Sequence, residues 1–431
     1  MSEKIKVLSL SDHPLSPSGV GTQTKYMIEA LLNTGKFKFV SFAGAIRHND
    51  YSPQKTEEYG DDWIIYPVNG YGDPDLLRGI MRQEKPDILW FMTDPRFYEW
   101  LWLMENEIRP NIPMVYYHVW DNYPYPDFNK KFYNSNDVIA CISKVTYDIV
   151  KTVAPDVQSC YLPHAVDMEV FKNYNKEKDP EIVKSVKQSR KLMAGNQEGD
   201  EKKMIFFWNN RNARRKQTGT LVWWFKEFLD EIGNDKACLV LHTDPKDENG
   251  QDLEAILDNL KIKNGEVRIS VEKVPPHSLA LMYSTADCTL NISDAEGFGL
   301  GTLESLACET PIIVNMTGGL QEQVTDGKNW FGIGVEPCSK AIIGSQTVPY
   351  IYEDRLNKEE FIEALKQMYD TWKNKPEEYK KWAKGGREHL EKNYNFKKFN
   401  ESWITLMTEI HEKYGSWENR KNYKHWELES L

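Results

Sequence analysis

The stretch SDAEGFGLGTLESLACETPIIV, residues 293–314, joins a glycine-rich loop to a helical pattern. The residues CTLNIS, 288–293, which lead into it, are typical of a short β-strand. Leu300, Leu303 and Leu306 then recur at helical spacing. The stretch therefore predicts a strand, a loop and a helix in that order.

Two glutamates lie eight positions apart in this stretch. Glu296 falls in the loop at the carboxyl end of the predicted strand, and Glu304 falls about one turn into the helix, beside its apolar stripe. A carboxylate beside an apolar stripe is partly desolvated, which costs free energy unless a hydrogen-bond partner compensates it. Ligand hydroxyls are one candidate partner. The alternative is an ordinary strand–helix turn with a satisfied surface glutamate.

The loop between the glutamates contains Gly297 and Gly299, and Gly301 follows at the start of the helix. Glycines let the backbone approach a ligand closely, and the start of a helix offers unpaired N–H groups and a partial positive charge. The loop therefore favours an anion such as a diphosphate.

Strand-like runs alternate with helical patterns along most of the 431-residue chain, which predicts an α/β protein with parallel sheets covered by helices. A polar, charged segment divides the runs into two series, and after about Asn329 the pattern loosens into an irregular insertion. We predict two Rossmann-like domains, at 1–171 and 204–385, joined by a charged linker region at 172–203. Residues 386–431 are expected to form helices that pack back on the first domain.

Composition excludes several other classes of protein. Hydrophobic residues make up 40% of the chain and charged residues 28%, and no run approaches the roughly 20 apolar residues of a membrane span. The six cysteines lack metal-ligand spacing, and the N-terminus resembles a first strand more than a signal peptide, so a reduced, cytoplasmic protein is expected. A net charge of -11 disfavours general binding to nucleic acid.

A basic segment, WNNRNARRKQTG at 208–219, follows the first strand of the second half. It places Arg211 and Lys216 five positions apart, with two further arginines between them. Cations at the carboxyl end of a strand suit a diphosphate, because arginine binds it bidentately and lysine as a point charge. A solvated basic turn is the alternative interpretation.

Two segments of the first half are candidates for ligand contact. In SDHPLSPSGVGTQTKYMIEALL, 11–32, a helix opens with Gly19, Val20 and Gly21, although a plain turn with a helix cap gives the same pattern. In YYHVWDNYPYPDF, 116–128, polar and aromatic residues follow a strand, where aromatic faces can stack on sugars or bases. The candidate acceptor-side residues there are His118, Trp120, Asp121 and Tyr123.

Asp73, Pro74 and Asp75 formally match a DxD metal motif. They lie in a turn-rich stretch without a supporting strand, so turn chemistry explains them better. No metal site is expected.

Taken together, these stretches resemble the retaining glycosyltransferases of family 4, which have the two-domain GT-B fold. The most specific part is EGFGLGTLE, 296–304, which matches the family's E-x7-E signature. Arg211 and Lys216 match its paired cations, and the glycines at 19 and 21, CISK at 141–144 and LPHAVD at 162–167 match in the first half. The basic segment lacks the usual glycine before the arginine, and YYHVWDN is an unusual form of the segment that carries the family's histidine.

The resemblance implies a nucleotide-diphosphate sugar as the donor, bound by the second domain in a cleft between the domains, with no cofactor. Glu304 would take the ribose hydroxyls and Glu296 the sugar hydroxyls. Arg211 and Lys216 would hold the diphosphate and stabilise the charge that develops as it leaves, so no metal is required. His118 would act on the acceptor side. Further donor contacts would come from Gly19, Val20, Gly21, Gly297, Phe298, Gly299 and Leu300.

The leading hypothesis is therefore sugar transfer, with retention, to a hydroxyl of a glycan or another acceptor. A hydroxylated base in DNA is an alternative acceptor. A lipid is less favoured, because the first half has no basic amphipathic helix. Two hypotheses of other classes are a nucleotide-sugar epimerase and a non-catalytic protein that binds nucleotide sugars.

Overall fold

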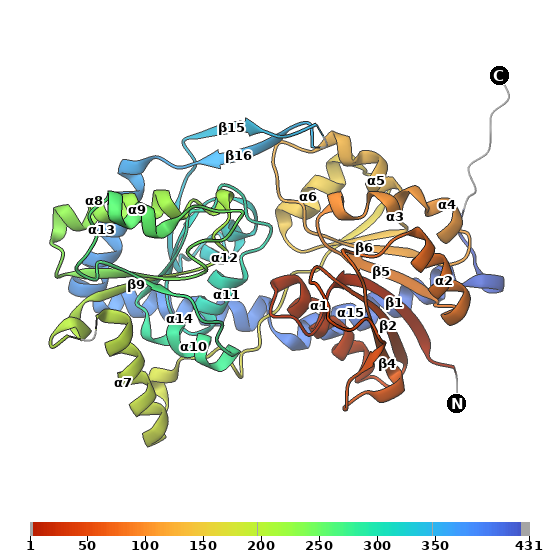
Figure 1. Ribbon diagram of the computed structural model, residues 1–431, viewed down its shortest axis with the longest axis horizontal. Helices are drawn as coiled ribbons and strands as arrows, with labels where there is room; N and C mark the ends of the chain where they lie inside the picture. The colour runs from red at the N-terminus through yellow and green to blue at the C-terminus, as the bar shows by residue number, and fades with distance from the viewer. Residues whose placement is uncertain (1–2, 196, 347, 424–431) are drawn as a thin grey trace. The chain divides into compact units, whose positions relative to one another are not determined.

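The computed structural model describes residues 3–195, 197–346 and 348–423. The chain forms two compact units (Figure 1). Unit 1 is the described part of Met1–Ala165 and Phe396–Leu431, and unit 2 is that of Val166–Asn395. Residues 424–431, the end of the predicted C-terminal segment, lie outside the described residues.

Unit 1 is built on an eight-stranded sheet with the order β3-β4-β2-β1-β5-β6-β7-β8. Every pairing is parallel except that of β3 with β4. Central strands such as β5 are buried at every position, as expected of a sheet covered on both faces. The strands are β1 (Ile5–Asp12), β2 (Phe37–Gly44), β3 (Gln54–Lys55), β4 (Trp63–Pro67), β5 (Ile88–Met92), β6 (Met114–His118), β7 (Val138–Cys141) and β8 (Gln158–Tyr161).

The helices of unit 1 include one from the far end of the chain, α15 (Phe396–Tyr414). Its apolar stripe is buried, and Trp403 packs edge-on against Trp90 and Tyr117, with ring centroids 6.0 and 4.9 Å apart. This burial explains why α15 belongs to unit 1. The other helices are α1 (Gly19–Leu32), α2 (Pro74–Glu84), α3 (Glu99–Leu103), α4 (Glu105–Ile108), α5 (Lys130–Asn134) and α6 (Lys144–Val153).

Unit 2 is built on a six-stranded parallel sheet with the order β11-β10-β9-β12-β13-β14. A separate antiparallel pair, β15 and β16, lies in the segment that was predicted to be irregular. The strands are β9 (Met204–Asn209), β10 (Ala237–His242), β11 (Val267–Ser270), β12 (Cys288–Asn291), β13 (Ile312–Asn315), β14 (Gly332–Val335), β15 (Ser339–Ile343) and β16 (Ile351–Arg355).

The sheet of unit 2 is covered by helices, which complete a hydrophobic core of leucine, phenylalanine and tryptophan side chains. The predicted α/β architecture with two parallel sheets is thus confirmed. The helices are α7 (Pro180–Ala194), α8 (Thr218–Ile232), α9 (Leu253–Asn259), α10 (Pro276–Thr285), α11 (Leu300–Ala307), α12 (Gln321–Val324), α13 (Lys358–Asn374) and α14 (Pro376–Asn393).

The segment predicted as a charged linker, 172–203, contains α7 and lies in unit 2. Arg190 anchors this helix, because its guanidinium donates to Asp287 at 2.6 Å and to the carbonyls of Thr285 and Lys203. The segment is polar because most of α7 faces solvent, and the partly buried Arg190–Asp287 ion pair helps to hold it.

The order of the strands reverses in the middle of each sheet. In unit 1, β2 lies on one side of β1 and β5 lies on the other. In unit 2, β10 and β12 lie on the two sides of β9 in the same way. In parallel α/β sheets, ligands bind at the carboxyl ends of the strands beside such a reversal. The two carboxyl edges are therefore the places where functional side chains are expected.

Candidate functional site

The strand–loop–helix stretch has the predicted local structure. β12 ends at Asn291, and α11 begins at Leu300. Gly299 caps the helix with φ +93°, a left-handed conformation that favours glycine, and a Cβ atom there would lie 2.6 Å from Leu320. Leu303 and Leu306 are buried, so the apolar stripe faces the core and the loop remains at the carboxyl edge of the sheet.

Glu296 forms a buried ion pair with Lys216, and both residues are less than a tenth exposed. Asn291 and Ser293 also donate to the carboxylate, each at 3.4 Å. Burial by itself raises the pKa of Glu296, but the charges of Lys216 and Arg215 and the hydrogen bonds outweigh it and lower the pKa to about 2. The carboxylate is therefore ionised at neutral pH.

The loop that carries Glu296 is held by a second glycine-rich turn. The N–H of Gly319 donates to the Glu296 carbonyl at 3.0 Å, and a Cβ atom on Gly318 would lie 1.8 Å from the same oxygen. The buried Gln323 side chain donates to the Phe298 carbonyl at 2.7 Å. These contacts fix the backbone that precedes the start of α11.

Glu304 lies on α11 and is half-buried. Burial raises its pKa to about 7, and a hydrogen bond with Tyr283 opposes that rise. The Tyr283 hydroxyl in turn accepts a hydrogen bond from Asn209, at 2.9 Å. Sequence reasoning missed Tyr283 and Asn209, although Asn209 ends β9 and is the second residue of the basic segment.

Arg211 is exposed and forms a bidentate ion pair with Asp247, with nitrogen–oxygen distances of 2.6 and 3.0 Å. Lys216 is instead buried against Glu296. The two cations that were predicted to bind the diphosphate therefore pair with different carboxylates. Asp247 was not predicted, because it lies in the loop after another strand, β10.

A polar cluster next to Lys216 was also missed. Arg214 donates to both oxygens of the buried Glu353 on β16, at 2.9 and 2.6 Å. Asp294 pairs with Arg355 of the same strand at 2.7 Å, and burial raises the pKa of Asp294 to about 6. The hairpin β15–β16 is thus attached to the loops that carry Lys216 and Glu296. This cluster was not predicted, because the segment that contains β15 and β16 was expected to be an irregular insertion.

The predicted glycine segment of unit 1 forms the start of α1. The Ser18 side chain caps the helix by accepting from the Gly21 N–H at 2.9 Å, and it donates to Asp12 at 2.6 Å. Gly19 is exposed and Val20 is half-buried. A Cβ atom on Gly21 would lie 2.6 Å from the His13 carbonyl, so glycine is needed for this close packing.

His118 ends β6 and has no exposed surface. Its Nε2 atom shares a hydrogen bond with the Tyr133 hydroxyl at 2.7 Å, and burial lowers its pKa to about 3. Because β6 lies inside the sheet, aromatic neighbours surround the imidazole. In this structure His118 is a core residue, and its acceptor-side role stays a prediction. Of the neighbouring candidates, Trp120 is buried, Asp121 is half-buried and Tyr123 is exposed.

The loops at the carboxyl edge of unit 1 expose large side chains. The ring of Tyr71 packs at a tilt against the exposed Phe97, with ring centroids 4.8 Å apart, and the Tyr71 hydroxyl donates to Asp12 at 2.9 Å. His13 and His48 also meet at this edge, with centroids 5.6 Å apart. Other exposed apolar side chains in these loops are Leu15, Ile46, Tyr51 and Tyr123.

The DxD match at 73–75 caps a helix. The Asp73 carboxylate accepts hydrogen bonds from the N–H groups of Asp75 and Leu76 at the start of α2. Within the described ranges, no group of three or more histidine, cysteine, aspartate or glutamate side chains is placed to hold a metal ion. Among the same residues, no helix has the length and apolar composition needed to cross a membrane.

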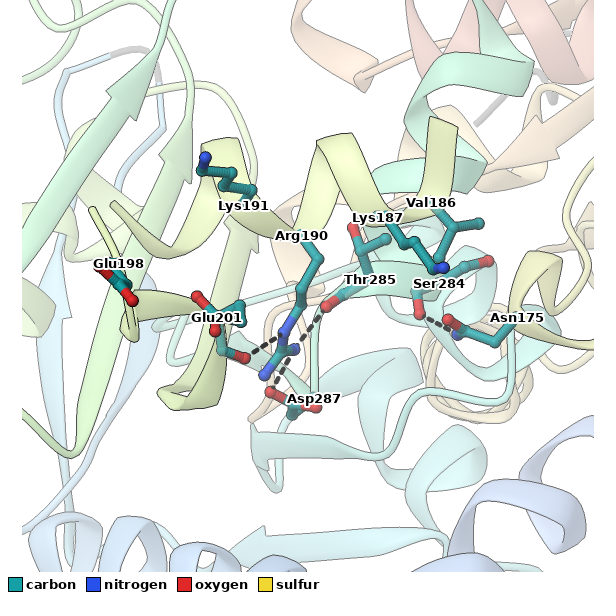
Figure 2. A pocket seen from close by; sticks show the side chains of 10 residues that line it. All are labelled: Asn175, Val186, Lys187, Arg190, Lys191, Glu198, Glu201, Ser284, Thr285 and Asp287. Carbon is teal, nitrogen blue, oxygen red and sulfur yellow. Dashed lines mark hydrogen bonds and ion pairs between the residues drawn. The ribbon is translucent and has the colours of Figure 1, made fainter. Parts of the chain in front are cut away.

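A cavity of about 860 Å³ lies elsewhere in unit 2, between α7 and α10 (Figure 2). Figure 2 shows Arg190 between Thr285 and Asp287, with Glu201 on its other side. Asp287 directly precedes β12, so the cavity is at the amino edge of the sheet, opposite Glu296. Because Arg190 is occupied by the contacts that anchor α7, we assign the cavity no part in the candidate site.

Residues 189–389 match the family model described as "Glycosyl transferases group 1". A D-inositol 3-phosphate glycosyltransferase from Streptosporangium roseum is 49% identical over 61 residues, which are 14% of this chain and 14% of that protein. An alpha-monoglucosyldiacylglycerol synthase from Streptococcus pneumoniae is 27% identical over 195 residues, 45% of this chain and 41% of that protein. The matched region thus spans less than half the length of either relative.

Solved structures resemble nearly the whole chain. Sucrose-phosphate synthase from Thermosynechococcus elongatus has a TM-score of 0.72 at 16% identity, covering 95% of this chain and 100% of that one. Anabaena Alr3699/HepE in complex with UDP-glucose has a TM-score of 0.65 at 12% identity, covering 94% and 99%. The predicted GT-B fold is confirmed, and so is the predicted resemblance to these glycosyltransferases.

Proposed function

We propose that this chain, similar to group 1 glycosyltransferases over residues 189–389, transfers a sugar from a nucleotide-diphosphate sugar to an acceptor hydroxyl. The observation that carries the proposal is the buried Lys216–Glu296 pair beside the start of α11. It joins the predicted cation to the first glutamate of the E-x7-E signature at the carboxyl edge of unit 2. The complex of Alr3699/HepE with UDP-glucose supports a donor of this class.

Lys216 is proposed to stabilise the leaving diphosphate. As the bond between sugar and phosphate breaks, negative charge accumulates on the phosphate oxygen, and a cation shielded from water stabilises that charge more than an exposed one does. Glu296 pairs with Lys216 and holds the cation in place. Glu296 is ionised and can accept hydrogen bonds from hydroxyls of the sugar.

Glu304 is proposed to receive the ribose hydroxyls of the nucleotide, and Arg211 to add a contact to the diphosphate from the exposed side. The start of α11 adds N–H groups and a partial positive charge. These groups supply the charge stabilisation for which other enzymes use a metal ion. We therefore propose a metal-independent reaction, and the E-x7-E signature supports retention at the anomeric carbon.

The acceptor is proposed to bind at the carboxyl edge of unit 1. Exposed aromatic rings such as Phe97 and Tyr123 can stack on the apolar face of a sugar, and polar groups of the same loops can fix its orientation. A glycan or another compound rich in hydroxyls fits this edge best. The names of two relatives, which mention an inositol phosphate and a glucosyldiacylglycerol, support a hydroxyl acceptor.

The test is incubation with a panel of nucleotide sugars, with and without a mixture of glycan acceptors. We expect a new glycoside whose anomeric configuration, measured by NMR, equals that of the donor, and slow release of free sugar without an acceptor. A 2-epimer of the sugar would indicate an epimerase instead, and binding without turnover would indicate a non-catalytic protein. A thermal-shift panel identifies the base, because a nucleotide at about 100 times its Kd stabilises the protein by about 2.7 kcal/mol.

A further inference from the structure

Two polar side chains near Glu304, one fully buried and one half-buried, have no part in the reaction described so far. Tyr283 on α10 is fully buried, and Asn209 ends β9. The Asn209 amide donates to the Tyr283 hydroxyl oxygen at 2.9 Å. The same hydroxyl interacts with the Glu304 carboxylate.

Tyr283 is the donor in its hydrogen bond with Glu304, which lowers the pKa of that carboxylate. Burial and the charge of Glu304 raise the pKa of Tyr283 well above its usual value, so its hydroxyl keeps its proton. Because the amide of Asn209 donates to the hydroxyl oxygen, the hydroxyl hydrogen is directed to Glu304. The three side chains therefore form a directed series, from amide to hydroxyl to carboxylate.

The position of the Tyr283 hydroxyl is fixed by its surroundings. Its ring packs edge-on against Phe207, with centroids 5.1 Å apart, and its carbonyl accepts the Thr310 hydroxyl at 2.7 Å. A Cβ atom on Gly301 would lie 3.1 Å from both the Tyr283 hydroxyl and the Asn209 carbonyl. Glycine at position 301 therefore leaves this space open, which explains one glycine of the signature by packing and not by ligand contact.

We infer that Tyr283 is a positioning residue which, held by Asn209, orients the Glu304 carboxylate toward the two ribose hydroxyls of the nucleotide. The inference rests on the proposed function for the identity of the ligand, and on the contacts of Tyr283 for the mechanism. A carboxylate that accepts one hydrogen bond from a fixed donor keeps its remaining lone pairs for two further hydroxyls.

Other charged and titratable groups lie on the elements that surround Glu304. The elements packed against α11 are α10, α14, β12 and β13. On α14, Arg387 donates to the Ala307 and Phe171 carbonyls and pairs with Glu391, and Lys384 pairs with Glu388. The thiols on this side are Cys288, which starts β12, and Cys308, which follows α11, and burial raises the pKa of both. Tyr283 is the group whose hydrogen bond lowers the pKa of Glu304.

The sign of the pH effect follows from these contacts. The ionised carboxylate accepts both ribose hydroxyls, so nucleotide affinity should fall as the pH falls through the pKa of Glu304, about 7. Removing the Tyr283 hydroxyl removes a group that lowers this pKa. The midpoint of the pH dependence should therefore move upward in a Tyr283→Phe variant.

The experiment is calorimetric titration of the protein with nucleoside diphosphates from about pH 6 to about pH 9, and with inorganic pyrophosphate at each pH. We expect Tyr283→Phe to bind the preferred nucleotide about fivefold more weakly at neutral pH, the loss of about one hydrogen bond, with a raised midpoint. Pyrophosphate affinity should not change, because it has no ribose. Tyr379→Phe is the matched control, since Tyr379 is a half-buried tyrosine of unit 2 whose hydroxyl donates to the Asp287 carbonyl at 2.7 Å.

An unchanged midpoint in Tyr283→Phe, with nucleotide binding by the wild type intact, would overturn this inference and leave the proposed function standing. A wild type that binds none of the nucleotides would overturn the proposed function itself. Should Tyr283→Phe fold poorly, Asn209→Ala removes only the donor that fixes the hydroxyl. It should weaken nucleotide binding about twofold to threefold and leave pyrophosphate binding unchanged, and equal losses for both ligands would overturn the inference.

Discussion

The carboxyl edges of the two sheets differ in their chemistry. In unit 2 the edge is ionic, because Lys216, Arg211 and Arg214 each have a carboxylate partner. In unit 1 the corresponding edge exposes aromatic and aliphatic side chains, and His118, one of its histidines, is buried and neutral. A diphosphate requires fixed charge, whereas a neutral hydroxyl compound requires shape and stacking. The difference supports assigning the donor to unit 2 and the acceptor to unit 1.

The ionic edge itself contains two kinds of ion pair. Lys216–Glu296 is buried, while Arg211 in the Arg211–Asp247 pair is 61% exposed. Removing one partner from a buried pair leaves an uncompensated charge, which typically costs about 3–5 kcal/mol, whereas an exposed pair contributes about 0–1 kcal/mol. Lys216 is therefore the stronger test of the ionic edge.

The largest effect is expected for Lys216→Ala. It should slow transfer and donor hydrolysis on the order of 10²-fold and destabilise the protein by about 3–5 kcal/mol. Activity assays and urea unfolding measure the two effects. The double variant Lys216→Met with Glu296→Gln makes the pair neutral and should recover most of the stability but not the rate. Recovery of both would mean that the pair is structural and the edge is not catalytic.

The second prediction concerns Glu304, whose carboxylate accepts a hydrogen bond from the Tyr283 hydroxyl. Burial raises its pKa to about 7 from the ordinary 4.5, so the folded protein loses stability as the pH rises through this interval. Glu304→Gln should be more stable than the wild type by up to about 3 kcal/mol above pH 7, and the difference should vanish below about pH 4.5. Thermal unfolding across this range checks the sign. A variant that is less stable at high pH contradicts the burial argument.

The third prediction concerns His118, at the carboxyl edge of unit 1. His118→Ala leaves the buried Tyr133 hydroxyl without its imidazole partner and should destabilise the protein by about 2 kcal/mol at neutral pH. The pKa of His118 is lowered to about 3, so this contribution weakens as the pH falls below about 6.5. Nucleotide affinity, measured by calorimetry, should stay within about twofold of the wild type. Loss of that affinity at unchanged stability would assign His118 to the donor side.

The fourth prediction tests whether the aromatic edge recognises the acceptor. Phe97→Ala and Tyr123→Ala each remove an exposed ring and should raise the KM for the acceptor several-fold, since a stacking contact contributes about 1 kcal/mol. Donor affinity and stability should change little. The exposed Trp223 on α8 of unit 2 offers a control, because Trp223→Ala should alter neither KM. Equal effects on donor and acceptor would remove the distinction between the edges.

The smallest expected effect is that of a chelator. If Lys216, Arg211 and the start of α11 supply the charge stabilisation, EDTA should leave the rate of transfer unchanged. Rates measured before and after dialysis against EDTA decide this. Complete loss of activity, restored by manganese, would show that the cations of the ionic edge are insufficient.

Much of the fold could be predicted because its signals are local. Hydrophobic runs and helical spacing predicted the two parallel sheets, and nine consecutive residues, 296–304, predicted the loop with Glu296 and the helix with Glu304. The hairpin β15–β16 was missed because its two strands have little alternation of buried and exposed residues. Its position depends on two ion pairs with distant residues, Glu353 with Arg214 and Arg355 with Asp294. Helix α7 was taken for a linker because most of its side chains are polar and only Met193 and Ala194 at its end are buried, which leaves no periodic apolar signal.

The sequence by itself therefore determined the α/β class, the E-x7-E stretch and the cations of the basic segment, because each depends on neighbouring residues. Only the tertiary structure decided which cation meets which carboxylate. Lys216 and Glu296 are 80 positions apart, Arg211 and Asp247 are 36, and Arg214 and Glu353 are 139. It also decided that His118 is buried and that Tyr283 lies beside Glu304. Spacing along a chain fixes local geometry, whereas these contacts depend on how distant strands end at one edge of a sheet.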